Sequence, residues 1–244
     1  MVIANEDGFQ STVSGGWARD PADPNLGGVG MSTYRPSNIG SCTKLYTGVA
    51  LMQILSQRGP DLETALDETI APYLPPLWLD PSRRPANVPL QQAQRIVEKA
   101  NNTTFRMLLD HTAGMSDPIP GPRPDNLDDN PDYYNFCQPL TVARGCYAYG
   151  NEHYRIMTYL IAGLVDGPAL LAVHTASNNL PMDDYIDTMR DAYGQSFEAY
   201  MRDHFFPQVN GSFAPSPDPA NDYNPGTTAL MYLDPTDTTG IEWN

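Results

Sequence analysis

A long run of helical segments after residue 40 constrains the fold of this 244-residue chain more than any other feature. The first helix is expected over about 41–58, where apolar residues recur every three or four positions: Leu45, Val49, Met52 and Leu55. Gly59 and Pro60 follow. A glycine supplies the left-handed cap of a helix and proline cannot continue one, so the helix is expected to end there.

Further helices are predicted over 61–74, 90–100, 104–111, 151–164, 183–192 and 197–206. The helix at 104–111 has Thr103 or Thr104 as a candidate N-cap. The helix at 151–164 has a buried stripe made of Tyr154, Met157, Ile161 and Leu164. The apolar run at 157–173 is interrupted by glycine, aspartate and proline, so no membrane span is expected. Residues 113–139 form an acidic, proline-rich loop that is too long for a simple connector.

Strand-like sequence is confined to the beginning of the chain, at 1–4 and 10–17. A sheet of two strands is only marginally stable on its own, so these strands are expected to need further strands as partners. We therefore expect three parts: N-terminal strands at 1–40, a helical domain at 41–210 and an irregular tail at 211–244 that leads toward missing C-terminal strands.

Composition excludes some kinds of partner and cofactor. The net charge is −15, with 29 acidic against 14 basic residues, which argues against binding to nucleic acid or anionic lipid. Neither His-x-x-x-His nor Cys-x-x-Cys occurs, so no metal and no cofactor are expected. Cys137 and Cys146 bracket a short loop and could form a disulfide, which would leave Cys42 as a small buried residue.

The most informative motif is Ser41-Cys42-Thr43-Lys44 at the start of the first predicted helix. Residues three apart on a helix lie side by side, so an amine at position 44 can take or polarise the hydroxyl proton of Ser41. The pattern is short and common by chance, and the competing interpretation is a helix cap with a solvated lysine. However, the chain has only two lysines, Lys44 and Lys99, and one of them falls in the motif.

The sequence around this motif resembles that of class C β-lactamases, penicillin-binding proteins and related esterases. Residues 37–50 are similar to the stretch around the family's nucleophile, and 51–75 resemble the passage into its next loop. Residues 104–115 are similar to its Leu-Leu-x-His-Thr-Ser-Gly segment, and Tyr149-Gly150-Asn151 fits its Tyr-x-Asn motif. The resemblance implies an α+β fold, with an antiparallel sheet, largely incomplete in this chain, packed against a helical domain.

The resemblance also assigns roles to residues. It implies Ser41 as nucleophile, Lys44 and Tyr149 as a proton relay, and Asn151 as the group that binds the substrate's acyl-side amide. A phenol beside an ammonium group is a plausible partner in such a relay. Gly150 stands where many relatives have serine, which removes one hydroxyl contact.

The family's third motif, Lys-Thr-Gly or His-x-Gly on a late strand, does not follow Asn151. In the family, the strand that bears this motif supplies one of two oxyanion-hole N–H donors, and losing one donor costs on the order of 10²–10³ in rate. We therefore expect that residues 1–244 are not the whole catalytic unit and that a second chain or a missing C-terminal segment completes the site.

The function predicted from these residues is serine hydrolysis through an acyl-enzyme, acting on esters, D-amino-acid peptides or β-lactams. The alternative is a catalytically impaired penicillin-binding or sensor protein of the same fold. Location is unknown, and the resemblance alone favours a periplasmic or secreted protein. His111 is predicted to be a structural residue near the site, and His153 a surface residue.

Overall fold

The structure is a computed structural model that describes residues 2–4, 10–12, 17–19, 29–30, 40–115 and 131–205. These residues fall into two compact units. The strands and the short 3₁₀ turn η1 (Gly40–Cys42) belong to the first unit, and the chain from Thr43 belongs to the second.

The described part of the first unit contains two pairs of short antiparallel strands. β1 (Val2–Ala4) pairs with β2 (Gln10–Thr12), and β3 (Trp17–Arg19) pairs with β4 (Val29–Gly30) with an irregular register. The two pairs are separate two-stranded ladders. The larger antiparallel sheet remains a prediction, and the tail at 211–244 lies outside the described residues.

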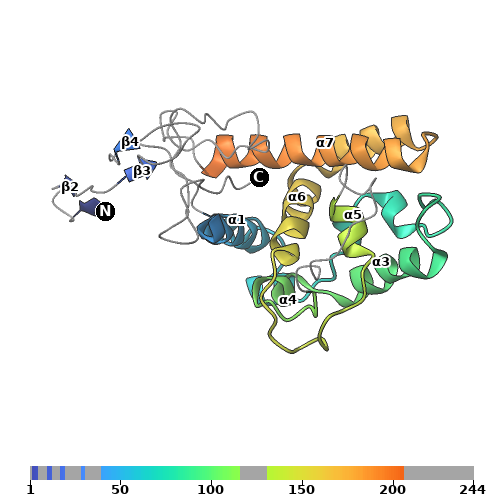
Figure 1. Cartoon of the computed structure of the whole chain (residues 1–244), viewed down its shortest axis with the longest axis horizontal. Helices are drawn as coiled ribbons and strands as arrows, with labels where there is room; N and C mark the ends of the chain where they lie inside the picture. Colours follow the sequence, from blue (N-terminus) through green and yellow to red (C-terminus); the bar gives the residue numbers. More distant parts are fainter. Residues whose placement is uncertain are drawn as a thin grey trace. The chain divides into compact units, whose positions relative to one another are not determined.

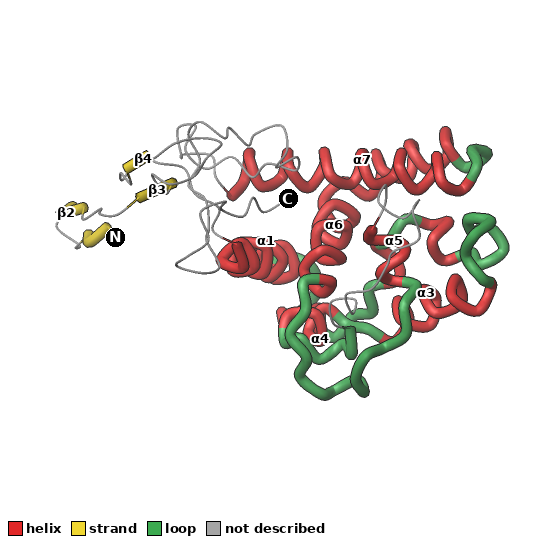
Figure 2. The backbone as a smooth tube through the Cα atoms, viewed as in Figure 1, coloured by secondary structure: helices red, strands yellow, loops and turns green. Residues whose placement is uncertain are grey.

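The described part of the second unit is built from helices (Figures 1 and 2). Its α-helices are α1 (Thr43–Ser56), α2 (Leu62–Leu66), α3 (Leu90–Asn102), α4 (Phe105–Leu109), α5 (Pro131–Phe136), α6 (Glu152–Ser177) and α7 (Met182–Tyr200). Short 3₁₀ helices η2 (Ala71–Tyr73) and η3 (Pro76–Leu79) lie between α2 and α3, and the π-helix η4 (Met201–Phe205) continues α7.

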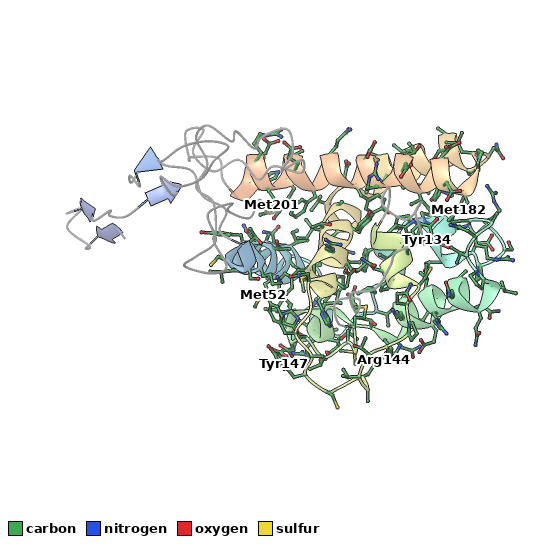
Figure 3. All side chains as sticks on the ribbon, viewed as in Figure 1. Met52, Tyr134, Arg144, Tyr147, Met182 and Met201 are labelled. Atoms are coloured by element: carbon green, nitrogen blue, oxygen red, sulfur yellow. The ribbon has the colours of Figure 1, made fainter. Side chains whose placement is uncertain are left out.

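Helix α6 lies at the centre of this unit, in contact with α1, α4, α5 and α7. Helix α7 packs along α6, with Met182 and Met201 at its two ends (Figure 3). The core between α5, α6 and η3 is aromatic: the Trp78 ring lies 5.5 Å from that of Tyr133 and 4.9 Å from that of Tyr159. Buried aromatic side chains contribute large apolar areas, so this cluster fixes how η3 and α5 sit on α6.

Helix ends follow the expected sequence signals. Thr104 is the N-cap of α4, and its hydroxyl accepts a hydrogen bond from the Met107 N–H at 3.3 Å. Asp61 caps α2 in the same way, accepting from the Thr64 N–H at 2.7 Å. Gly59 has φ 106°, the left-handed conformation expected just after α1. The predicted cap at Thr104 and the predicted stop at Gly59 are therefore confirmed, and the cap at Asp61 is an additional finding.

The first helical segment of α6 ends close to the predicted residue 164, at a kink at Asp166, and a second segment, which was not predicted, continues to Ser177. Asp166 has non-helical dihedral angles, φ −132° and ψ 25°, and Pro168 follows two residues later. Proline is tolerated in the first turn of a helix, where its missing N–H has no intrahelical partner. The proline therefore opens a second helical segment across a kink.

Among the described residues, α6 is also long and apolar enough to cross a membrane by length and composition alone, with a mean hydropathy of 1.8. Core helices of globular proteins can have the same length and composition. Here Ile156, Leu160 and Ile161 of α6 are fully buried inside the helical unit. Only 39% of the apolar window is buried, and Leu171 in the second segment is exposed, so packing accounts for the apolar side chains of the first segment of α6 alone.

Four other predictions need correction. The helix predicted at 61–74 is the short α2, which ends at Leu66 and is followed by the 3₁₀ turn η2. The loop predicted at 113–139 contains the helix α5 at Pro131–Phe136. The segments predicted at 183–192 and 197–206 form one helix, α7, and Gly194 lies within it with no atom close to its Cα on the side-chain side. In α1 the predicted apolar stripe does not form the buried face, because Leu45, Val49 and Met52 are exposed and only Leu55 is buried. The buried side of α1 is instead made by Gly48, Ala50, Leu51, Ile54 and Leu55.

Candidate active site

Ser41 lies in the η1 turn, two residues before the first residue of α1, and its side chain is exposed. The sequence predicts a helix start at Ser41, and the chain passes there from a 3₁₀ turn into an α-helix. The adjacent Cys42 is exposed, so the expectation of a buried small residue is wrong.

Lys44 and Asn151 are brought together from positions far apart in the chain. Lys44 is in the first turn of α1, and its Nζ donates a hydrogen bond to Asn151 Oδ1 at 2.5 Å. Asn151 occupies the N-cap position of α6, but its side chain makes no capping hydrogen bond. Its carbonyl oxygen accepts the first bonds of the helix, from the N–H groups of Tyr154 at 2.9 Å and Arg155 at 3.0 Å. The amide side chain is thus directed to Lys44 while the backbone begins the helix.

Two tyrosine rings surround the same ammonium group. Lys44 Nζ lies 5.0 Å from the centre of the Tyr149 ring and 5.8 Å from that of Tyr154. Both distances are within the range of cation–π attraction. Tyr149 is 47% exposed and Tyr154 is half-buried. Burial raises the pKa of Tyr154, and the nearby Asp110 and Tyr149 act in the same direction.

The position of Tyr149 depends on an irregular pairing between two segments. The Ala148 N–H donates to His111 O, the Gly145 N–H to Thr112 O and the Thr141 N–H to Gly114 O, each at 2.9 Å. These bonds hold the loop after α5 along residues 111–114; Figure 3 labels Arg144 and Tyr147 on this loop. Gly114 has φ 81°, and a Cβ there would lie 2.7 Å from Val142 O. Glycine at this position therefore permits the close approach of the two segments.

His111 and His153 lie immediately behind Tyr149. The His111 ring is 4.8 Å from the Tyr149 ring at an interplanar angle of 35°, and 5.3 Å from the Tyr154 ring. Its Nδ1 lies 3.3 Å from His153 Nδ1. The prediction that His111 is structural and near the site is confirmed. The prediction that His153 is a surface residue is wrong, because its side chain is fully buried.

A second cluster of buried polar side chains, Lys99 and Glu152, lies at the first turn of α6. Lys99 of α3 is 2% exposed, and its Nζ lies 5.3 Å from the centre of the Phe136 ring. Burial lowers the pKa of Lys99 to about 8, opposed by the negative charges of Glu152 and Glu98. Glu152, the residue after Asn151, is itself buried and accepts a hydrogen bond from Asn135 Nδ2 at 2.9 Å. This group anchors the first turn of α6 against α5.

The three cysteines are free, so the disulfide between Cys137 and Cys146 is not formed. Cys137 is buried and Cys146 is exposed. Burial raises the pKa of the Cys137 thiol to about 12, so this thiol is unreactive at neutral pH. Within the described ranges, no group of three or more His, Cys, Asp and Glu side chains is arranged to hold a metal ion.

The structure thus brings together Lys44, Tyr149 and Asn151 of the four predicted site residues. Sequence reasoning missed His153 and Tyr154 as neighbours of the site. The signal available for Tyr154 was its spacing, because a residue three positions after Asn151 on a helix returns to the same face.

Comparison with family models adds a match to the Beta-lactamase family over residues 14–170, more than half of the chain. No curated protein and no solved structure matches the chain in the corresponding comparisons. The matched span includes the Ser41 turn, Lys44 and the Tyr149-Gly150-Asn151 segment. The chain therefore belongs to the β-lactamase family, within the serine β-lactamase/transpeptidase-like superfamily, whose members are generally serine hydrolases.

Proposed function

We propose that this protein is a serine hydrolase in which Ser41 forms an acyl-enzyme and Lys44 and Tyr149 move the protons. The observation that carries the proposal is the convergence of Lys44 with Tyr149 and Asn151, through the 2.5 Å hydrogen bond and the 5.0 Å ring contact. A solvated lysine beside a simple helix cap does not require either contact. Family membership gives this convergence its chemical interpretation.

In the proposed reaction, the Ser41 oxygen attacks the carbonyl carbon of the substrate and its proton passes to the Lys44–Tyr149 pair. The bond to the leaving group then breaks, and the leaving group takes that proton. Water attacks the Ser41 ester in the second half of the reaction, with the same pair accepting and returning a proton. Nucleophile activation by a neighbouring base of this kind contributes about 10²–10⁴ in rate.

Asn151 is proposed to have two functions. Its Oδ1 holds the Lys44 ammonium group, and its Nδ2 is the group proposed to donate a hydrogen bond to the substrate's acyl-side carbonyl. The two functions use opposite ends of one amide, so the same side chain can orient the base and the substrate together.

The proposed substrates are esters, D-amino-acid peptides or β-lactams, all of which present a carbonyl to a serine nucleophile. We also propose, on family grounds, that a second chain or a further segment supplies the third motif and that the protein acts outside the cytoplasm. A penicillin-binding or sensor protein would share the first step of the mechanism and lack the second.

The experiment that tests the proposal is intact mass analysis of the full chain after exposure to a fluorophosphonate, with Ser41→Ala beside it. The matched control is Ser56→Ala, an exposed serine at the other end of α1 whose hydroxyl only contacts Gln53 O. We expect an adduct in the parent and in Ser56→Ala and none in Ser41→Ala. Turnover of an ester then separates a hydrolase from a sensor, whereas an unlabelled parent protein overturns the proposal.

A further inference from the structure

The peptide group of Gly150 lies between two buried histidines. Its N–H donates to His111 Nδ1 at 3.4 Å, and its carbonyl oxygen lies 3.4 Å from His153 Nδ1. The two Nδ1 atoms are 3.3 Å apart. His111 is 8% exposed and His153 is fully buried, so water does not readily replace these contacts.

The contacts determine where the protons of the neutral pair lie. Because the Gly150 N–H points at His111 Nδ1, that nitrogen must be the acceptor, and the His111 proton is therefore on Nε2. His153 Nδ1 faces two acceptors, His111 Nδ1 and Gly150 O, so it carries the His153 proton. Both contacts of His111 Nδ1 need its lone pair.

Gly150 is the middle residue of the segment that carries the proposed catalytic groups. Tyr149, on one side, has its ring against His111, and Asn151, on the other, is bonded to Lys44. His111 has φ 55°, an uncommon conformation for a residue with a side chain, and its carbonyl oxygen accepts from the Ala148 N–H. The histidine is therefore fixed from both its backbone and its ring.

We propose that His111 and His153 are positioning residues that fix Tyr149 and Asn151 against Lys44 and do so only while His111 is neutral. A proton on His111 Nδ1 would place an N–H opposite the Gly150 N–H and the His153 N–H. Both hydrogen bonds would then be lost, and the Tyr149-Gly150-Asn151 segment would lose its support. This proposal rests on the proposed function, and it makes acylation of Ser41 sensitive to pH in the acid range.

Nearby charges act in opposite directions on the protonation of the His111–His153 pair. The Lys44 ammonium group disfavours a second positive charge across the Tyr149 and Tyr154 rings, while Asp110, which lies near Tyr154, favours one. Among the described residues, titratable groups near the pair include Lys44 of α1, Asp110 after α4, Tyr147 and Tyr149 of the loop, and Tyr154 of α6. Histidine is the type of side chain whose charge ordinarily changes between about pH 5 and 8.

The test is the rate of Ser41 labelling by a fluorophosphonate between about pH 5 and 8, measured for the full chain and two variants. In His111→Asn, the side-chain oxygen replaces Nδ1 as an acceptor that does not titrate, and asparagine tolerates the positive φ at this position. We expect labelling of both proteins to fall as the pH is lowered, because the Lys44–Tyr149 pair must accept the Ser41 proton, and we expect the fall to be steeper in the parent than in His111→Asn. In His111→Ala we expect a loss of about 10–100-fold at every pH, as for a misplaced catalytic group.

The control is His174→Asn, which removes another partly buried histidine on α6 whose Nδ1 contacts the Tyr185 hydroxyl. It should keep the pH profile of the parent. The proposal is overturned if His111→Asn keeps the acid loss of the parent, or if His111→Ala is labelled at the parent's rate.

A second measurement does not depend on activity. The chain contains two Tyr-Gly pairs, Tyr149-Gly150 and Tyr193-Gly194. Labelling with ¹³C-carbonyl tyrosine and ¹⁵N-glycine therefore selects the amide signals of Gly150 and, as an internal control in α7, Gly194. We expect the Gly150 signal to shift with pH in the parent and to stay in place in His111→Asn. If the parent is never labelled at Ser41 but Gly150 behaves in this way, the proposed function fails and the histidine pair stands. Equal shifts of the Gly150 signal in the parent and in His111→Asn would overturn the proposed role of the histidine pair.

Discussion

At the scale of single residues, the side chain of Asn151 allows the closest test of the site. We predict that Asn151→Asp lowers the rate of Ser41 acylation by about 10²-fold or more, the range associated with general-base catalysis. The carboxylate would still accept from Lys44 Nζ, but it would offer the substrate no N–H. The measurement is the pseudo-first-order labelling rate at neutral pH, together with the melting temperature.

The matched control is Asn101→Asp, which makes the same change of charge on the exposed side of α3. We expect that variant to be labelled like the parent, and we expect Asn151→Asp to melt no lower than the parent because the contact with Lys44 is kept. Labelling of Asn151→Asp at the parent's rate would show that the amide has no part in acylation.

The candidate site residues could be found from the sequence because they occur in short motifs with fixed spacing. Lys44 and the Tyr149-Gly150-Asn151 segment were found in this way. The surroundings of His153 could not, because its burial depends on the pairing of the loop after α5 with residues 111–114. That pairing joins segments about 30 residues apart in sequence and has no local pattern.

At the scale of elements, the packing of α6 on η2 depends on a glycine. A Cβ at Gly163 would lie 2.4 Å from Tyr73 O, a backbone atom that cannot rotate away. We predict that Gly163→Ala destabilises the protein by about 1–3 kcal/mol, the usual cost of overpacking. Urea unfolding followed by circular dichroism measures this difference.

Gly194→Ala provides the matched control, because this glycine lies within α7 and its added Cβ would meet no atom within 4 Å. We expect it to stabilise the protein by about 0.4–1 kcal/mol, since alanine loses less backbone entropy in a helix. Equal effects of the two substitutions would mean that α6 does not approach η2 as closely as the structure has it.

The region of α6 around Gly163 shows why the existence of a helix could be predicted better than its length. Gly163, Asp166 and Pro168 predict a break, and α6 does break at Asp166, but the second helical segment that continues to Ser177 was not predicted. In α1 nearly every side is apolar, so periodicity predicted the helix but not which face is buried. Both differences come from contacts between elements, which outweigh local preference.

At the scale of the whole molecule, the chain is strongly acidic and contains two lysines, each of which lies in a specific environment. Lys44 lies in the proposed active site, and Lys99 is buried between α3 and α5 beside Phe136 and Glu152. A chain with a net charge of −15 gains solubility from its surface acids. A lysine that is buried in the folded protein instead makes the free energy of unfolding depend on pH.

Burial lowers the pKa of Lys99 to about 8 in the folded protein from its ordinary value of 10.5. Above about pH 8 the unfolded chain therefore binds more protons at this position than the folded protein, so the stability contributed through Lys99 rises with pH. We predict that Lys99→Met removes this rise, so the stability difference between variant and parent changes by about 1 kcal/mol between about pH 7 and 9 in favour of the parent. Urea unfolding at several pH values measures the two curves.

Lys99→Arg separates this effect from a simple change of packing. Arginine stays charged over the whole range, so the variant should be destabilised at each pH and should not recover as the pH rises. The other buried titrating groups act in the opposite direction at higher pH, because burial raises the pKa of Cys137 and of Tyr134 to about 12. The comparison is therefore confined to pH values below about 9, where Tyr134 stays protonated in both states. The Cys137 thiol, whose ordinary pKa is 9.0, begins to ionise in the unfolded chain over this range, but it does so equally in the parent and in Lys99→Met. Parallel curves for the parent and Lys99→Met would show that the lysine is charged in the folded protein throughout, and that its burial among α3 and α5 is offset by Glu152 and Glu98.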